Sequence, residues 1–103
     1  MAIVKLTQDN FKTTLDSNEI VLIDFYATWC APCRMLGQEL EDLSLEHPEI
    51  LIGKINVDEE GEIAQAFNIR SIPQLYISKN GKIVRIISGY VTKDVIMGAI
   101  KEC

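Results

Sequence analysis

The sequence has little of what several protein classes require. It has one histidine and three cysteines, and its ten basic and fifteen acidic residues give a net charge of −5. Because no lysine and arginine cluster stands out, we expect no binding of nucleic acid. No apolar run approaches the roughly 18 residues of a membrane span, and residues 1–7 lack the pattern of a secretion signal. We therefore expect an untargeted, cytoplasmic protein that does not bind membranes.

The cysteines are too few and too unevenly placed for a disulfide-stapled secreted scaffold. Cys30 and Cys33 form one close pair, and Cys103 is the last residue. A structural zinc site needs four ligands. Beyond the pair, the sequence offers only Cys103 and His47, which we expect at a helix end beside Pro48, so zinc is a weak alternative. The spacing of the pair favours redox chemistry. We interpret Cys103 as an incidental thiol, with dimerisation or regulation as the alternative.

The chain length fits one domain with a core of its own. Of its 103 residues, 48% are hydrophobic and 24% charged. Folding at this size buries about 60 to 70% of the surface that the unfolded chain exposes, so no disulfide is needed as a staple. We expect residues 1–103 to form a single domain that is a monomer.

Hydrophobic patterning predicts alternating strands and helices. The run 20–26 is nearly continuous in apolar residues, as in a central strand covered on both faces. After the cysteines, Leu36, Leu40 and Leu43 recur at helical spacing. Further strands are predicted at 3–6, 51–57, 74–78 and 82–88, and further helices after Thr7, at 59–67 and after Thr92. This order predicts an α/β fold with a central mixed sheet of about five strands flanked by four helices.

Local signals predict where some elements begin and turn. Asn80-Gly81 predicts a two-residue hairpin turn between the last two strands. Thr7 is predicted to cap the first helix, in which Leu6 and Phe11 have the spacing of a hydrophobic staple. Thr92 is predicted to cap the last helix, whose inward face would carry Val95, Ile96, Ala99 and Ile100.

The pair of cysteines is predicted to lie at the start of a helix. Pro32 suits the first turn, which places Cys30 where free N–H groups and the helix dipole stabilise an anion by about 0.3 to 2 kcal/mol. We expect this to lower the pKa of the Cys30 thiol from about 8.5, with a weaker contribution from Arg34. Cys33 would be shielded within the first turn. Cys30 is therefore predicted to attack a target disulfide and Cys33 to resolve the mixed disulfide.

Six parts of the sequence together match the pattern of a known family. They are Asp24-Phe25-Tyr26-Ala27, Trp29-Cys30-Ala31-Pro32-Cys33, Lys54-Ile55-Asn56-Val57-Asp58, Ile69-Arg70-Ser71-Ile72-Pro73, Asn80-Gly81 and Gly89. On these segments the chain resembles the thioredoxin family over essentially its whole length. The fold implied is the thioredoxin fold, and the activity implied is reduction of protein disulfides through a redox-active Cys30–Cys33 disulfide without a cofactor. A separate thioredoxin reductase would re-reduce the protein.

Asp24 interrupts the apolar run of the central strand. A buried carboxylate costs stability unless it is paired or protonated. From the residues alone, two explanations of Asp24 stay open: a local hydrogen bond at the end of the strand, or a role in the redox site. The resemblance implies that Asp24 lies behind Cys33 and helps to move its proton, and that Lys54 faces Asp24. We expect Asp24→Asn to slow resolution of the mixed disulfide with little effect on folding.

The resemblance also implies a surface on which target proteins dock. From sequence alone Pro73 is an ordinary strand start, because only about 5 to 6% of bonds before proline are cis. The family has a cis proline facing the dithiol, and the residue before it, here Ile72, pairs with an extended substrate segment. For Trp29, packing in the core is the alternative. The predicted docking rim around Cys30 comprises Trp29, Ala31, Pro32, Ile72, Pro73, Gly89 and Tyr90.

Some residues depart from the commonest family pattern and bear on partner preference. Ala31 and Ser71 each replace a frequent glycine, and Gln74 replaces a frequent threonine. Gln38 replaces a helix-bending proline, and Tyr26 replaces a tryptophan.

A second hypothesis is a binding subunit that uses this fold without redox turnover. Its function would survive Cys30→Ser, whereas disulfide reduction would not.

Overall fold

The computed structural model describes residues 3–103, and its strands and helices alternate along most of the chain. The expected α/β fold with a mixed sheet is confirmed. In chain order the elements are β1 (Ile3–Lys5), α1 (Phe11–Asp16), β2 (Ile20–Tyr26), α2 (Ala31–Glu46), β3 (Leu51–Asn56), α3 (Gly61–Ala66), β4 (Gln74–Lys79), β5 (Lys82–Ser88) and α4 (Lys93–Glu102).

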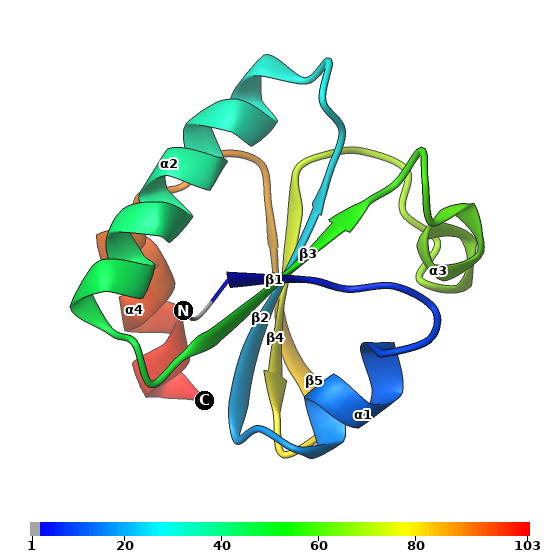
Figure 1. Ribbon diagram of the computed structural model, residues 1–103. Helices are drawn as coiled ribbons and strands as arrows, with labels where there is room; N and C mark the ends of the chain where they lie inside the picture. Colours follow the sequence, from blue (N-terminus) through cyan, green and yellow to red (C-terminus); the bar gives the residue numbers. More distant parts are fainter. Residues whose placement is uncertain (1–2) are drawn as a thin grey trace.

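The five strands form one sheet in the order β1-β3-β2-β4-β5. β2 runs parallel to β3 and antiparallel to β4, which places it at the centre. Residues 21–25 of this strand are buried, as the continuous apolar run predicts. Figure 1 looks along the sheet and shows α2 and α4 on one face and α1 and α3 on the other. β2 leads to the top of that view, where α2 begins, so the cysteine pair lies at one end of the central strand.

The core consists of two layers, one on each face of the sheet. Alternate residues of β2 supply the two layers, because successive side chains of a strand point to opposite faces. Leu22 packs in the cluster that includes Leu40 and Ile96 under α2 and α4, whereas Ile23 packs with Ile63 on the other face. Burial of each such side chain contributes about 1.5 to 3 kcal/mol. The two layers hold β2, and hence the start of α2, from both sides.

The first helix begins later than predicted, and Thr7 does not cap it. α1 starts at Phe11, with Asn10 at the N-cap position. The side-chain oxygen of Asn10 instead accepts the N–H of Thr7 at 2.7 Å, which keeps residues 7–10 in a turn. Phe11 is therefore the first helical residue, so Leu6 and Phe11 do not occupy the two positions of a hydrophobic staple, although both belong to the same core cluster.

The last helix begins as predicted, but one of its four expected inward residues points outward. The hydroxyl of Thr92 accepts the N–H of Val95 at 3.4 Å, which confirms the cap. Ile96 and Ala99 are buried and Ile100 packs against the same cluster. Val95 is 52% exposed, because it precedes the stripe formed by Ile96, Ala99 and Ile100 and lies about 100° around the helix from Ile96.

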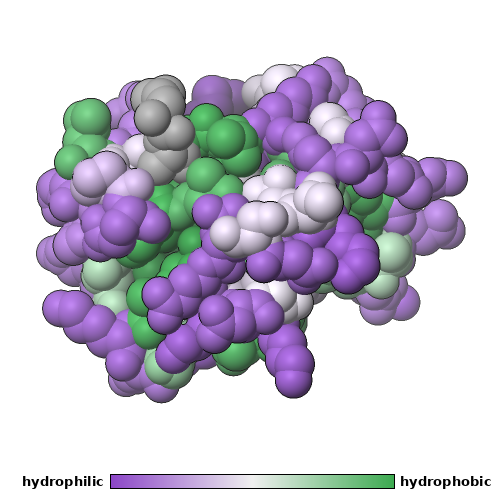
Figure 2. All heavy atoms as spheres, turned by 60° about the horizontal axis from the view of Figure 1, so that its bottom comes forward, coloured by the Kyte–Doolittle hydropathy of each residue, from purple (hydrophilic) through white to green (hydrophobic). Residues whose placement is uncertain are grey.

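The hairpin of β4 and β5 ends the sheet on one side. Asn80 and Gly81 both have positive φ, as a two-residue hairpin turn requires, so this prediction is confirmed. β5 is an edge strand, and its residues Ile83, Val84 and Ile86 are exposed. Figure 2, which brings the bottom of Figure 1 forward, shows hydrophilic atoms over most of that face and a band of hydrophobic atoms between them. Within residues 3–103, no helix has the length and apolarity to cross a bilayer.

Candidate active site

The cysteine pair lies at the N-terminus of α2. Cys30 occupies the N-cap position in an extended conformation, and Pro32 lies in the first turn, as predicted. The two sulfur atoms are at disulfide distance, with 5.2 Å between the Cα atoms. The backbone N–H of Cys33 donates a hydrogen bond to Cys30 Sγ at 3.2 Å. A thiolate at Cys30 would therefore accept a charge-assisted bond at the positive end of the helix dipole.

Both sulfur-bearing residues are largely covered. Cys30 is 6% and Cys33 3% exposed, and they pack with Ala27 in a small cluster of their own. Arg34 is exposed, and its guanidinium donates to the backbone carbonyl of Thr28 at 3.1 Å. That contact fixes the loop before the cysteines, while an effect of Arg34 on the pKa of Cys30 stays a prediction.

Asp24 is fully buried near the end of β2. Neither of its carboxylate oxygens has a hydrogen-bond partner among the described residues, so the local hydrogen bond considered from the sequence is wrong. Lys54 lies opposite it on β3, with Nζ 3.8 Å from Asp24 Oδ2. Burial disfavours the charged carboxylate and raises its pKa to about 6, although the positive charge of Lys54 opposes part of this shift. Asp24 can therefore gain or lose a proton near neutral pH.

A cavity of about 400 Å³ extends from Cys33 to Lys54, the partner of Asp24. Its lining includes Cys33 and Gly37 from α2, and Lys54 from β3. The ammonium of Lys54 lies 4.5 Å from the ring centroid of Tyr26, within the range of a cation–π contact. The space is roomy and polar enough for water. Water in this cavity would contact Cys33 and Lys54, while Asp24 lies buried behind Lys54.

The predicted docking segments meet beside the cysteines. The peptide bond between Ile72 and Pro73 is cis, as the resemblance implies. Ile72 packs against the cluster that contains Cys30 and Cys33. Gly89, which has a positive φ of 82°, donates its N–H to the carbonyl of Pro73 at 2.9 Å. Two segments that are separate in sequence thus form one surface next to the disulfide.

Trp29 is 69% exposed, so packing in the core, the alternative considered for it, is wrong. Its indole Nε1 donates a hydrogen bond to Asp58 Oδ2 at 2.9 Å, which fixes the ring over the surface. Ala31 and Pro32 are also exposed, and Tyr90 is 40% exposed. These four residues of the predicted docking rim are therefore accessible to a partner.

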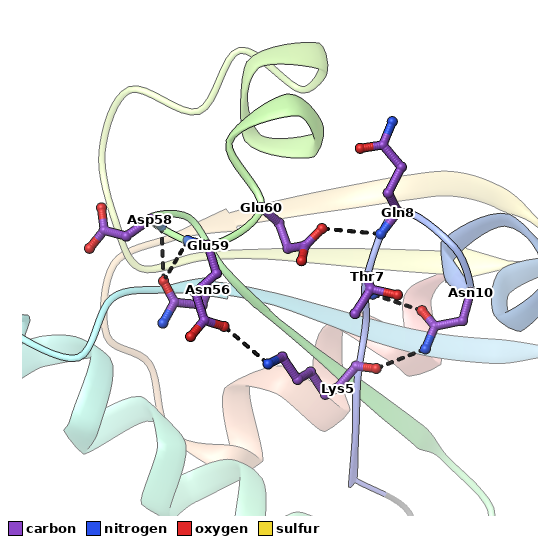
Figure 3. Close-up of polar contacts among 8 residues, drawn as sticks. All are labelled: Lys5, Thr7, Gln8, Asn10, Asn56, Asp58, Glu59 and Glu60. Carbon is purple, nitrogen blue, oxygen red and sulfur yellow. Dashed lines mark hydrogen bonds and ion pairs between the residues drawn. The ribbon is translucent and has the colours of Figure 1, made fainter.

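Asp58 is a residue of this site to which the sequence analysis assigned no role. The amide oxygen of Asn56 accepts the N–H groups of Asp58 and Glu59 at 2.9 and 3.3 Å, which shapes the loop after β3. Figure 3 shows this loop, with the carboxylate of Asp58 directed away from Asn56 and from the Lys5–Glu59 ion pair of 3.1 Å. An Asn that accepts the backbone N–H two residues later is a known turn signal, but the bond between Asp58 and Trp29 is visible only in the structure.

The remaining cysteine and the histidine lie away from the site. The imidazole of His47 contacts Glu49 at 3.3 Å, and its backbone N–H donates to Leu43 at the end of α2. The thiol of Cys103 donates to the carbonyl of Ala99 at 3.1 Å. Over residues 3–103, no group of three or more histidine, cysteine or acidic side chains is placed to hold a metal ion.

Comparison with known proteins decides the family. The family model for thioredoxin matches residues 2–102. The chain belongs to the thioredoxin family. A thioredoxin of Chlorobaculum thiosulfatiphilum is 45% identical over 98 residues, which cover 93% of this chain and 91% of that protein. A thioredoxin of Chlamydia pneumoniae is 39% identical over 97 residues, which cover 94% of each chain.

Solved thioredoxin structures agree with the fold. A mutant thioredoxin from Halobacterium salinarum NRC-1 superposes with a TM-score of 0.89 at 32% identity, covering 97% of this chain and 88% of that one. The oxidised form of mitochondrial thioredoxin 3 from Saccharomyces cerevisiae gives 0.88 at 32% identity, covering 98% and 95%. Together with the paired Cys30 and Cys33, family membership makes this protein a thiol–disulfide oxidoreductase that acts on disulfide targets, and a purely binding role is not favoured.

Proposed function

We propose that this protein reduces protein disulfides, with Cys30 as the attacking residue and Cys33 as the resolving one. The Cys30 thiolate attacks one sulfur of the target disulfide, and the other target sulfur leaves as a thiolate and takes up a proton. Cys33 then loses its proton and attacks Cys30 Sγ, which closes the Cys30–Cys33 disulfide and releases the second target thiol. Two electrons pass to the target. The bond from the Cys33 N–H to Cys30 Sγ is the observation that carries this division of roles.

Asp24 accepts the proton of Cys33 in this proposal. Its raised pKa of about 6 lets it exist as a base near neutral pH while remaining able to give the proton back. Water in the cavity lined by Cys33 and Lys54 would carry the proton part of the way, and Lys54 borders both that cavity and Asp24. Lys54 keeps the pKa of Asp24 from rising further, so its role is to keep part of the carboxylate ionised in a fully buried position.

The docking rim binds an extended segment of the target beside the disulfide. The backbone of Ile72 pairs with that segment, and Trp29, held by Asp58, covers one flank. Main-chain pairing makes few demands on target side chains, which suits a protein with many substrates. The remaining members of the rim are Ala31, Pro32, Pro73, Gly89 and Tyr90.

The oxidised protein must be reduced again before the next cycle. We assign this step to a separate thioredoxin reductase, as in the family, and place both proteins in the cytoplasm. Residues 1–103 act in this scheme as one monomeric domain, and the disulfide itself replaces a cofactor.

Variants of the three cysteines test the proposal. With dithiothreitol as reductant and insulin as target, Cys30→Ser should lose disulfide reduction, whereas Cys103→Ser should retain it. Cys33→Ser should accumulate mixed disulfides through Cys30, since nothing resolves them. Mass spectrometry of the trapped species would identify the targets. Reduction of insulin by Cys30→Ser, or trapping through Cys103 instead of Cys30, would contradict the assigned roles.

A further inference from the structure

A carboxylate on α2 holds the loop that carries Tyr90. Glu39 is half-buried and lies further along the helix than the cysteines. Its Oε1 accepts a hydrogen bond from the backbone N–H of Lys93 at 2.8 Å, and its Oε2 accepts one from the hydroxyl of Tyr90 at 3.4 Å. One side chain thus joins α2 to two points that are 54 and 51 residues away in sequence.

The bond to Lys93 also gives a partner to a free backbone N–H group at the start of α4. Lys93 is the first residue of that helix, and the first N–H groups of a helix have no partner within it. The hydroxyl of Thr92 accepts the N–H of Val95, and Glu39 accepts that of Lys93. A negative charge is favoured at a helix N-terminus by the helix dipole. Glu39 therefore fixes where α4 begins and, with it, where the preceding loop lies.

The same loop reaches the docking rim. At its other end, the N–H of Gly89 is bonded to the carbonyl of Pro73. Between the loop and α2 lies a depression of about 450 Å³, lined by Ala31, Arg34, Met35, Gln38, Glu39 and Tyr90. Ala31 lies between the two cysteines, so the depression opens beside the disulfide. Its width depends on the position of the Tyr90 ring, which Glu39 holds.

A second contact joins α2 to α4 without involving Tyr90. The ammonium of Lys93 forms an ion pair with Glu46, near the end of α2. Glu46 is about half exposed, and exposed ion pairs contribute only about 0 to 1 kcal/mol. Glu46→Gln is therefore a matched control: it neutralises a carboxylate between the same two helices but leaves the Tyr90 loop bonded.

We propose that Glu39 is a positioning residue for target proteins, which holds Tyr90 and the start of α4 against α2 and so shapes the depression that receives the target chain beside Cys30. This inference rests on the proposed reduction of protein disulfides. Glu39 does not touch the reacting sulfur atoms, so its loss raises KM for a protein target more than it lowers kcat.

Three variants test this proposal with insulin as the protein disulfide and dithiothreitol as reductant. Glu39→Leu removes both acceptors at similar volume, and we expect KM for insulin to rise about fivefold while kcat changes less than about twofold. Glu39→Gln keeps an acceptor oxygen for Lys93 and should recover part of the loss. Glu46→Gln should behave as the wild type. Faster hydrogen exchange of the Lys93 amide in Glu39→Leu would report that the bond has been removed.

Cystine serves as a small disulfide that cannot span the depression. The ratio of kcat/KM for insulin to that for cystine should fall about fivefold in Glu39→Leu. An equal loss with both disulfides, or an unchanged KM for insulin, would overturn the proposal. If Glu39→Leu does not fold, Tyr90→Phe and Glu39→Gln decide in the same way, since each should raise KM about twofold. Failure of the wild type to reduce insulin would instead refute the proposed reductase function.

Discussion

Lys54 Nζ lies 3.8 Å from Asp24 Oδ2 across the parallel pair β2 and β3, and no described group donates a hydrogen bond to either oxygen of Asp24. An ion pair at this distance offsets only part of the cost of burying the carboxylate, because desolvation still raises its pKa to about 6. The residue thus weakens the fold at neutral pH, and in the proposed mechanism it is also the proton acceptor for Cys33. This conflict between stability and chemistry can be measured.

Asp24→Asn should stabilise the protein at high pH and not at low pH. Between pH 4 and 6 the unfolded carboxyl ionises while the buried one stays protonated, so the free energy of unfolding of the wild type falls as pH rises. The asparagine variant lacks this loss and should be more stable by about 3 kcal/mol at pH 8. Urea unfolding at pH 4 and pH 8 measures the difference. The structure therefore replaces the sequence-based expectation of little effect on folding.

An exposed carboxylate provides the control for this measurement. Asp9→Asn removes the same charge at an exposed position, so its effect on stability should stay within about 0.5 kcal/mol. A stability gain of Asp24→Asn that is equal at pH 4 and pH 8 would show that ionisation of Asp24 is not its cause.

The same substitution should slow the second chemical step. General-base catalysis contributes about 10² to 10⁴ in rate, so we expect Asp24→Asn to reduce the rate of mixed-disulfide resolution about 10²-fold near pH 7. In the wild type this rate should rise as pH increases through about 6, where Asp24 ionises, and the variant should lose that rise. Single-turnover kinetics from pH 5 to 9 provide the test. A retained rise near pH 6 in the variant would assign it to another group.

Lys54→Met should raise the pKa of Asp24 above its present value of about 6, because the positive charge that favours the ionised carboxylate is lost. The rise of the resolution rate with pH should move to higher pH by the same amount. Carbon NMR of the Asp24 carboxyl measures the pKa directly. Lys12→Met, at an exposed ion pair on α1, is the control and should leave the Asp24 titration in place. A lowered pKa of Asp24 in Lys54→Met would contradict this account.

Asp58→Asn should loosen Trp29 on the docking rim. The hydrogen bond from the Trp29 indole would then have a neutral acceptor in place of a charged one. We therefore expect the free energy that holds the ring in place to fall by about 0.5 to 1.5 kcal/mol. Because the chain has one tryptophan, fluorescence anisotropy reports its mobility without interference. KM for insulin should rise about threefold. The control Glu59→Gln, at the next residue, should leave both the anisotropy and KM for insulin unchanged. An unaltered anisotropy in Asp58→Asn would contradict a role of Asp58 in holding Trp29.

Patterns along the chain predicted those parts of the fold that depend on local repetition. The apolar run of β2 reflects a strand that is buried on both faces. The spacing of Leu36, Leu40 and Leu43 reflects a helix that is buried on one face. The predicted cap at Thr7 failed because Asn10, three residues later, offers its amide oxygen to the Thr7 N–H and becomes the N-cap residue itself. Competition between two capping residues depends on where the chain must go next, which the local sequence does not specify.

Contacts between distant segments account for what the sequence did not predict in the site. The local sequence around Glu39 gives no reason to connect it with Tyr90, since that contact exists only once α2 packs against the loop before α4. The lack of a hydrogen bond to Asp24 likewise depends on what β3 and β4 place around it, whereas its presence in an apolar strand was visible from the sequence. Chemistry-bearing residues were therefore easier to find than the groups that hold them.

The exposed strand β5 has a consequence for the behaviour of this protein in concentrated solution. A strand at the edge of a sheet presents unpaired backbone groups to which a strand of another molecule can add, and Ile83, Val84 and Ile86 would make such an addition cohesive. Lys82 is exposed on the same strand, whereas Arg85 forms an ion pair of 2.9 Å with Glu102. An added strand would have to bury the charge of Lys82 and cover the Arg85–Glu102 pair, so resistance to aggregation depends on side chains that have no part in the chemistry.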